Sequence, residues 1–374
     1  MTVNRMRHKV VCVIGTRPEA IKMAPVINQL KQHPQFDCRV VATAQHRGLL
    51  DQVLALFDIQ PDIDLDIMQP NQTLASLNAR LLLELDRVLR DEAPDVVLAQ
   101  GDTTTVLSAA MASFYQRIPF GHIEAGLRTF DLDSPFPEEA NRLMASRLAR
   151  WHFAPTDGAV ANLVAEGVDR AAITLTGNTV IDALLAVSAG QPTLDVKLAP
   201  GARMILVTAH RRENFGAPIM AICTALKLLA ERNADLQFLY PVHPNPNVRD
   251  VAYGMLADCP NIVLCDPLDY ASFVAAMQRA YLIISDSGGV QEEAPALGRP
   301  VLVLREDTER PEAVACGVVK LVGTDTQHLV EQVQRLLDDR QAYAAMARGV
   351  SPYGDGHSAA RIVEVLAASL AGQG

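Results

Sequence analysis

The chain has 374 residues, a formal net charge of −10 at pH 7 and an isoelectric point near 5.4. An acidic chain of this kind is not expected to bind nucleic acid through a general basic surface. Hydrophobic residues make up 49% of the sequence and charged residues 20%, which excludes an intrinsically disordered chain. The length indicates two domains.

The cysteines and the apolar runs favour a cytoplasmic protein. No cysteine belongs to a C-x-x-C pair, and we expect reduced, mostly buried thiols at Cys12, Cys38, Cys223, Cys259, Cys265 and Cys316. The apolar run 10–14 is too short for a signal peptide, and no run approaches the roughly 18 apolar residues of a membrane-spanning helix. We therefore expect no membrane partner.

The first half of the chain alternates short apolar runs, typical of buried parallel strands, with helix-like segments. Strands are predicted at 9–14, 39–42, 95–99, 120–123 and 151–154. Helices are predicted at 18–31, 46–57, 73–91, 103–115, 137–149 and 159–165.

The same alternation restarts at Met204. Strands are predicted at 204–208, 237–240, 262–264, 281–285 and 301–304. Helices are predicted at 218–231, 270–279, 289–297 and 326–338, with further helix to 348 and an amphipathic Ala-rich helix at 357–371.

This order of elements predicts an α/β protein with two doubly wound, Rossmann-like domains that face a cleft. We expect a first domain at 1–177 and a second at 178–355, with the C-terminal helix, within 356–374, packing back onto the first. Ligands of such sheets bind outside the carboxyl ends of the strands.

The segment 285–293 reads Ser-Asp-Ser-Gly-Gly-Val-Gln-Glu-Glu and is typical of a strand end, a tight turn and a helix start. Free N–H groups at a helix start bind phosphate, and glycines let the backbone approach it closely. Glu293 lies four residues after Gly289, on the same side of the helix, where its carboxylate can accept hydrogen bonds from a ribose diol. The segment predicts a nucleoside diphosphate site; the alternative is an ordinary corner whose acidic first turn suits the helix dipole.

Polar and charged residues follow most of the other predicted strands, in 15–19, 45–47, 101–105, 122–128, 208–213, 241–244 and 308–312. Taken one at a time they have structural alternatives: Asp102 as a helix N-cap, Glu138 in a first turn after Pro137 at N1, Lys22 as a solvated side chain and His210 as a core histidine. Packing does not need so many ionisable groups at successive strand ends. Together they favour a ligand site.

Metal and dinucleotide sites find less support. His122 and Glu124 are two apart on a predicted strand and point to the same face, but no third ligand has a telling spacing. The first strand is not followed by G-x-G-x-x-G. We expect neither a metal nor a nicotinamide cofactor.

The motifs, taken in order, resemble the non-hydrolysing UDP-N-acetylglucosamine (UDP-GlcNAc) 2-epimerases. The resemblance runs from Val11 to the Pro352-Tyr353-Gly354 region. Its motifs lie in 15–25, 45–47, 101–105, 122–129, 135–142, 176–182, 210–214, 285–298 and 308–313. One departure is Leu268, where some relatives carry a polar residue that reaches the nucleotide, so one uracil contact would be left to the backbone.

The resemblance implies a glycosyltransferase-B-like fold, a homodimer, and interconversion of UDP-GlcNAc and UDP-N-acetylmannosamine (UDP-ManNAc) without NAD or an obligatory metal. Carried over motif by motif, UDP would be held by Arg17, Lys22, Phe273, Ser287, Gly288, Gly289, Glu293 and Arg310. The catalytic group would comprise Asp102, Glu124, Glu138 and His210. A second UDP-GlcNAc, acting as an activator, would contact Gln45, His46, Gln69 and Arg211.

The chemistry fits these residue types. The C2 proton of a GlcNAc unit has no adjacent carbonyl to acidify it, but loss of UDP from C1 gives that carbon oxocarbenium character and makes elimination to a glycal possible. Cationic groups and the Ser287 turn suit the departing diphosphate, and carboxyl groups suit proton removal and return. Clustered carboxylates can differ in pKa, so that one acts as acid while another acts as base.

Four alternatives remain open from the sequence. They are a glycosyltransferase of the same architecture, an epimerase that hydrolyses the glycal, a sensor that binds UDP-sugars unchanged, and a 2-epimerase of a modified UDP-GlcNAc derivative. UDP-ManNAc commonly serves cell-surface polysaccharide synthesis, which is the expected destination of the product.

Overall fold

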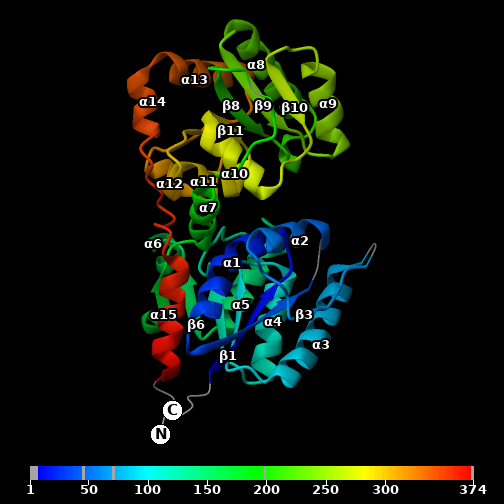
Figure 1. Ribbon diagram of the computed structural model, residues 1–374, viewed down its shortest axis with the longest axis vertical. Coiled ribbons are helices and arrows are strands. Elements are labelled where there is room, and N and C mark those ends of the chain that lie inside the picture. The colour runs from blue at the N-terminus through cyan, green and yellow to red at the C-terminus, as the bar shows by residue number, and fades with distance from the viewer. Residues whose placement is uncertain (1–6, 44–46, 70–71, 198, 372–374) are drawn as a thin grey trace. The chain divides into compact units, whose positions relative to one another are not determined.

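The computed structural model describes residues 7–43, 47–69, 72–197 and 199–371. They fold into two units, each with its own parallel sheet (Figure 1). Unit 1 comprises Met1–Ala183 and Tyr353–Gly374, and unit 2 comprises Leu184–Pro352.

In the described part of unit 1, seven parallel strands pair in the order β3-β2-β1-β4-β5-β6-β7. The strands are β1 (His8–Ile14), β2 (Phe36–Ala42), β3 (Ile63–Asp64), β4 (Val96–Gln100), β5 (Phe120–Ile123), β6 (Trp151–Ala154) and β7 (Ile173–Leu175). The helices are α1 (Arg17–Gln32), α2 (Arg47–Leu56), α3 (Leu74–Glu92), α4 (Thr104–Tyr115), α5 (Glu138–Leu148), α6 (Asp157–Ala165), η1 (Arg170–Ala172), α15 (Ser358–Ala371) and α7 (Thr179–Ala189), which runs into unit 2.

Three neighbouring strands of unit 1 are buried along their whole length. Every residue of β4, β5 and β6 is buried. Strands covered by helices on both faces read as continuous apolar runs rather than as an alternating pattern, which is why the sequence predicts them well.

The C-terminal helix α15 packs against α1, and Figure 1 shows it in red next to that helix. Two contacts fix its ends. The backbone N–H groups of Ser358 and Ala359 donate to the Asp182 carboxylate at 3.2 and 2.8 Å, and Trp151 Nε1 donates to Ser369 Oγ at 3.3 Å.

In the described part of unit 2, six parallel strands pair in the order β10-β9-β8-β11-β12-β13. The strands are β8 (Arg203–Thr208), β9 (Leu236–Pro241), β10 (Ile262–Cys265), β11 (Ala280–Ser285), β12 (Val301–Val303) and β13 (Val319–Leu321). The helices are η2 (Arg212–Asn214), α8 (Ala217–Arg232), α9 (Pro246–Leu256), α10 (Tyr270–Arg279), α11 (Gly288–Ala296), α12 (Pro311–Ala315), α13 (Thr326–Asp338) and α14 (Arg340–Met346).

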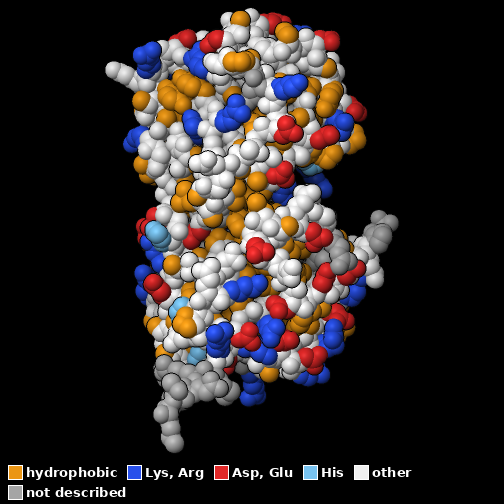
Figure 2. All heavy atoms as spheres, viewed as in Figure 1, with side chains coloured by type: hydrophobic (Ala, Val, Ile, Leu, Met, Phe, Trp, Pro, Cys, Tyr) orange, Lys and Arg blue, Asp and Glu red, His pale blue; other side chains and the backbone are white. Residues whose placement is uncertain are grey.

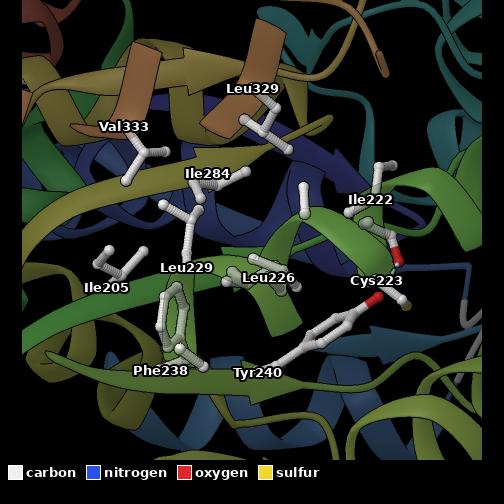
Figure 3. Packing of buried hydrophobic residues seen from close by; sticks show 14 of the residues in the cluster. Ile205, Ile222, Cys223, Leu226, Leu229, Phe238, Tyr240, Ile284, Leu329 and Val333 are labelled. Atoms are coloured by element: carbon white, nitrogen blue, oxygen red, sulfur yellow. Dashed lines mark hydrogen bonds between the residues drawn. The ribbon is translucent and has the colours of Figure 1, made fainter. Parts of the chain in front are cut away.

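The main core of unit 2 gathers side chains from α8, α13 and the central strands (Figure 3). Figure 3 shows Leu226 and Leu229 of α8 near Phe238 and Tyr240 of β9, all fully buried. The Tyr240 hydroxyl donates to the backbone carbonyl of Ala209 at 3.3 Å, which satisfies a polar group inside an apolar core.

The predicted class, an α/β protein of two doubly wound domains, is confirmed. The sequence did not predict eight of these elements: β3, β7, β13, α7, α9, α12 and the short 3₁₀ helices η1 and η2. The three strands have two or three residues each, too few to show a period, and α7 falls where we expected a domain junction. The helix predicted beyond 338 is a separate element, because the Asp339 side chain caps α14 by accepting from the N–H groups of Gln341 and Ala342.

On the face in view in Figure 2, lysine and arginine side chains are interspersed with aspartate and glutamate rather than gathered in one basic patch. Within the described part of the chain, each helix is too short or too polar to cross a membrane.

Candidate active site

The predicted site residues follow the central strands of both sheets. The strand order reverses between β1 and β4 in unit 1 and between β8 and β11 in unit 2. Arg17 follows β1 and Asp102 follows β4, while His210 follows β8 and Ser287 follows β11. Ligands of open α/β sheets bind at such switch points, so each unit presents candidate residues where its topology favours a ligand.

Asp102 is held by two residues of α5. Its Oδ2 accepts a hydrogen bond from Arg142 Nη2 at 2.7 Å, and its backbone carbonyl accepts one from Asn141 Nδ2 at 2.9 Å. The N-cap of α4 is Thr103, whose Oγ1 accepts from the N–H of Val106. The alternative that Asp102 caps this helix is therefore wrong.

Arg142 is anchored in turn by Glu139, whose side chain is fully buried. Glu139 Oε2 lies 3.2 Å from Arg142 Nη1, and its Oε1 accepts from the N–H groups of Thr129 and Phe130, both at 3.1 Å. One buried carboxylate thus connects the arginine that holds Asp102 to the loop between β5 and α5.

Glu124 follows β5 in a left-handed conformation, with φ of 63°. Its Oε2 accepts from Lys22 Nζ at 2.5 Å and from Asn178 Nδ2 at 2.8 Å. The alternative that Lys22 is a solvated side chain is therefore wrong. His122 is buried inside β5, where its Nε2 lies 2.7 Å from the Gly101 carbonyl and burial lowers its pKa to about 3. The expectation that His122 and Glu124 share one strand face is therefore also wrong.

The three predicted catalytic carboxylates of unit 1 gather at one edge of the sheet. The N–H of Gly101 donates to the carbonyl of Ile123 at 3.0 Å, which places the next residues, Asp102 and Glu124, at neighbouring strand ends. Glu138 begins α5, four residues before the arginine that holds Asp102, and therefore lies on the same face of that helix.

Arg17 and Glu138 each occupy the first residue of a helix, and both are half-buried. The sequence predicted Pro137 at N1 of α5, and this is wrong: Pro137 is the N-cap and Glu138 is the first helical residue. Side chains at helix starts project next to free backbone N–H groups, where anions bind.

In unit 2, Asp286 organises the loop that carries His210. Its fully buried carboxylate accepts through Oδ2 from the N–H groups of His210 and Arg211, both at 2.8 Å, and from Asn214 Nδ2 at 2.9 Å. Its Oδ1 lies 3.2 Å from His210 Nδ1. The ring is 41% exposed and lies parallel to His243, so it is not a core histidine.

The helix start predicted to bind a diphosphate is present. Ser287 is the N-cap of α11 and makes no side-chain capping bond. A Cβ atom on Gly288 would lie 2.8 Å from the Arg310 guanidinium, so glycine allows this cation to approach the helix start. Arg310 Nε is held by Glu292 Oε1 at 2.7 Å. A cation at the positive end of a helix dipole favours an anionic ligand.

Glu293 lies beside the glycine turn, as the sequence predicted: a Cβ atom on Gly289 would be 3.7 Å from Glu293 Oε2. The buried carboxylate accepts from the Tyr270 hydroxyl at 2.6 Å. The predicted nucleotide contact Phe273 is half-buried on α10, the helix that supplies Tyr270.

Glu309 draws three arginines together. Its carboxylate oxygens lie 2.6 Å from Arg305 Nη1 and 3.3 Å from both Arg310 Nη1 and Arg211 Nη2. Burial alone would raise the pKa of Glu309, but the arginines bring it down to about 2. Arg211, expected in an activator site, thus shares a carboxylate with Arg310, expected at the diphosphate.

The other activator candidates lie in unit 1. Gln69 is exposed in the segment after β3, where its N–H donates to Gln72 Oε1 at 3.4 Å. Gln45 and His46 lie outside the described residues.

Sequence reasoning missed the residues that hold the candidates in place, which are Glu139, Asn141, Arg142, Asn178, Tyr270, Asp286 and Glu292. Most belong to the quoted motifs, and the Glu-x-x-Arg spacing of Glu139 and Arg142 on one helix face was a readable signal. Most of the candidates that they hold are distant in sequence, as Asp102 is from Arg142 and Glu124 is from Asn178, so the spacing could not name them.

Comparison with known proteins gives consistent results over nearly the whole chain. The family model described as UDP-N-acetylglucosamine 2-epimerase matches residues 28–367. A UDP-N-acetylglucosamine 2-epimerase of Escherichia coli K12 is 53% identical over 372 residues, which cover 96% of this chain and 98% of that protein.

Solved structures agree with the sequence matches. The Neisseria meningitidis UDP-GlcNAc 2-epimerase, solved bound to UDP-GlcNAc, is 48% identical with a TM-score of 0.89 and covers 96% of this chain and 99% of its own. The Methanocaldococcus jannaschii enzyme, solved with UDP-GlcNAc and UDP, is 32% identical with a TM-score of 0.80, covering 96% and 99%. A glycotransferase of kitacinnamycin, 14% identical with a TM-score of 0.65, shares the fold.

Proposed function

Because the chain belongs to the UDP-N-acetylglucosamine 2-epimerase family of isomerases, as its motifs predicted, we propose that it interconverts UDP-GlcNAc and UDP-ManNAc by inversion at C2. Relatives solved with UDP-GlcNAc or UDP support a UDP-sugar as the ligand. The product would serve polysaccharide synthesis, and the working form would be a homodimer.

The observation that carries the proposal is the start of α11. Backbone N–H groups, two glycines and the Arg310 guanidinium meet there, and the Glu293 carboxylate lies beside the second glycine. This arrangement supplies positive charge for a diphosphate and an acceptor for a ribose diol within one helical turn. Phe273 and Ser287 complete the UDP contacts that we propose for unit 2.

Unit 1 supplies the groups for chemistry on the sugar. We assign C2 proton removal and return to the carboxylates Asp102, Glu124 and Glu138. The C1–O bond to UDP breaks and UDP leaves with the electron pair, while a carboxylate takes the C2 proton and a C1–C2 double bond forms. The intermediate is a glycal, and addition of UDP to C1 with proton return on the other face completes the epimerisation.

Charge on the leaving diphosphate needs stabilisation. We assign this to Arg17, Lys22 and His210 together with Arg310. Lys22 is already paired with Glu124, so it can also keep that carboxylate oriented. The buried carboxylate of Asp286 accepts from the backbone N–H of His210 and so holds the loop that presents the ring.

Proton NMR of the protein with UDP-GlcNAc in D2O, without added NAD or metal, tests the proposal. An anomeric UDP-ManNAc signal with deuterium entering at C2 is the expected result. Free ManNAc and UDP would indicate a hydrolysing epimerase, and an unchanged spectrum would overturn the proposal in favour of another UDP-sugar, a transferase or a sensor.

The catalytic assignment is tested by Asp102→Asn and Glu124→Gln, which keep side-chain size and remove the charge. Each should lower turnover by at least about 100-fold while UDP still binds, since the base acts only on the sugar. Asp91→Asn, at a side chain that is 68% exposed, is the matched control and should leave turnover unchanged. Turnover like that of the wild type in either site variant would refute the assignment.

Activation by a second UDP-GlcNAc is a separate part of the proposal, with Gln45, His46, Gln69 and Arg211 as the candidate contacts. Its test is the reverse reaction from UDP-ManNAc. A lag that added UDP-GlcNAc abolishes is expected, and hyperbolic kinetics with no need for added UDP-GlcNAc would contradict it.

A further inference from the structure

A buried carboxylate, Glu19, lies at the switch point of unit 1 between two loops that carry candidate site residues. Arg17 belongs to the segment that follows β1, and Asp102 to the segment that follows β4. Glu19 is in the first turn of α1 and is 3% exposed, and neither the motifs nor the proposed chemistry gives it a role.

The two oxygens of Glu19 serve the two loops separately. Oε2 accepts from the N–H groups of Gly15 and Thr16, at 2.5 and 3.1 Å. Oε1 accepts from the Thr103 hydroxyl at 2.5 Å. Thr103 directly follows Asp102 and caps α4, so the carboxylate connects the start of α1 to the start of α4.

The two loops are also packed closely enough for small shifts to matter. A Cβ atom on Gly15 would lie 2.5 Å from Thr105 Oγ1 and 2.7 Å from Thr43 Oγ1. Only glycine fits here, and the backbone of the first loop therefore lies directly against the first turn of α4. Loss of the hydrogen bonds of Glu19 would therefore shift both loops.

Unit 2 also has a buried carboxylate that joins the loops at its switch point, so the arrangement recurs in both units. Its switch-point carboxylate, Asp286, accepts from the N–H groups of His210 and Arg211, so it connects the end of β11 to the loop after β8. In both units a buried carboxylate joins the loops on either side of the reversal in strand order.

We propose that Glu19 is a positioning residue. It fixes residues 15–17, which lead into α1 and are called the Arg17 loop below, relative to residues 101–103, which lead into α4 and are called the Asp102 loop. This role rests on the proposed function, in which Arg17 binds UDP and Asp102 acts on the sugar. Misplacement of a reacting group by about 1 Å can lower a rate by roughly 100-fold. The hydrogen bonds of Glu19 to both loops therefore affect catalysis.

The hydrogen-bonding groups involved predict which substitutions of Glu19 and Thr103 preserve the two links. Glutamine can accept from Gly15 and Thr16 through its carbonyl and donate to Thr103 Oγ1 through its amide, so Glu19→Gln keeps both links. Glu19→Met keeps the length of the side chain and removes both. Of the two links, Thr103→Val removes only the one to the Asp102 loop, and Thr103→Ser restores it.

The experiment measures turnover of UDP-GlcNAc and the Kd for UDP in these four variants. Thr103→Val should lower kcat by at least about tenfold with the Kd for UDP little changed, because the Arg17 loop keeps its bonds to Oε2. Glu19→Met should lower kcat similarly and also weaken UDP binding. Glu19→Gln and Thr103→Ser should stay within about threefold of the wild type.

Thr156→Val controls for the helix cap that Thr103→Val also removes. Thr156 is the N-cap of α6 in the same unit, accepting from the N–H of Ala159 at 3.1 Å, and this variant should keep full activity. If Glu19→Met does not fold, the Thr103 pair decides the question alone.

Two failures can be told apart. Wild-type protein that leaves UDP-GlcNAc unchanged would overturn the proposed function, and with it this role for Glu19. The other failure is an active wild type whose Thr103→Val variant keeps its kcat, or loses no more of it than Thr103→Ser and Thr156→Val lose. That result would overturn the positioning role of Glu19 and leave the proposed function standing.

Discussion

Replacing Glu19 with glutamine is expected to stabilise unit 1 at alkaline pH and to have much less effect at acid pH. Burial raises the pKa of Glu19 from its ordinary value of 4.5 to about 7, against the lowering effect of the hydrogen bonds from Thr103, Gly15 and Thr16. The charge of Asp102 adds to the rise. The glutamine keeps the shape and the hydrogen bonds but does not titrate.

The sign follows from linkage. Below the unfolded-state pKa the carboxyl is protonated in both states and the shift costs nothing. As the pH rises from 4.5 towards 7, the unfolded chain releases the proton first, so the folded state loses stability. At about 1.4 kcal/mol for each pKa unit, the full cost above the folded-state pKa is roughly 3 kcal/mol, of which roughly 2 kcal/mol arises between about pH 5.5 and 8.

The assay is urea unfolding of both proteins at about pH 5.5 and 8, followed by the fluorescence of Trp151. The chain has one tryptophan, and it lies buried in β6 of unit 1, so its signal reports on the unit that contains Glu19. Other groups titrate in both proteins, and their contributions cancel when the glutamine variant is compared with the wild type at each pH.

A stability difference between variant and wild type that stays constant from pH 5.5 to 8 would refute the reasoning, because it would mean that Glu19 titrates equally in both states. Glu84→Gln is the control, since that side chain is 43% exposed on α3. Its stability difference should not change with pH by more than about 0.5 kcal/mol.

Two further predictions concern the framework of unit 1. Glu166→Gln should destabilise the unit by about 3 kcal/mol in urea unfolding, because it leaves the fully buried Arg128 guanidinium without its carboxylate; the exposed Glu84→Gln should cost under about 1 kcal/mol, and equal effects would contradict the argument. Gly126→Ala should cost at least about 2 kcal/mol, since its Cβ atom would collide with the backbone of α6 at a φ of 93°. Gly167→Ala, at a φ of 85° in open space, should cost only about 1 kcal/mol, and similar melting temperatures for the two variants would refute the collision.

Local signals in the sequence were enough for most of the framework. Continuous apolar runs marked the buried strands, and the Ser-Gly-Gly turn before Glu293 marked the helix start where Arg310 and the glycines now meet. Both depend on residues within about one helical turn of each other, where side-chain direction follows from the helical or extended period.

The contacts and backbone conformations of the candidate residues could be known only from the tertiary structure. Asp102 looked like a helix cap until Arg142, 40 positions away, was placed beside it, and Glu124 looked like a strand residue until its backbone conformation was known. The sequence offered no signal that pairs Glu124 with Lys22, which lies 102 positions away.

The sequence by itself therefore determined the class of fold, the family and the types of residue at the strand ends, because these follow from local period and from ordered motifs. Only the tertiary structure decided which carboxylates hold others in place, as Glu19, Glu139 and Asp286 do. The physical reason is that a buried carboxylate is tolerated only where donors converge on it. For Glu19 and Asp286 some of those donors come from segments that the sheet order, not the sequence order, makes neighbours.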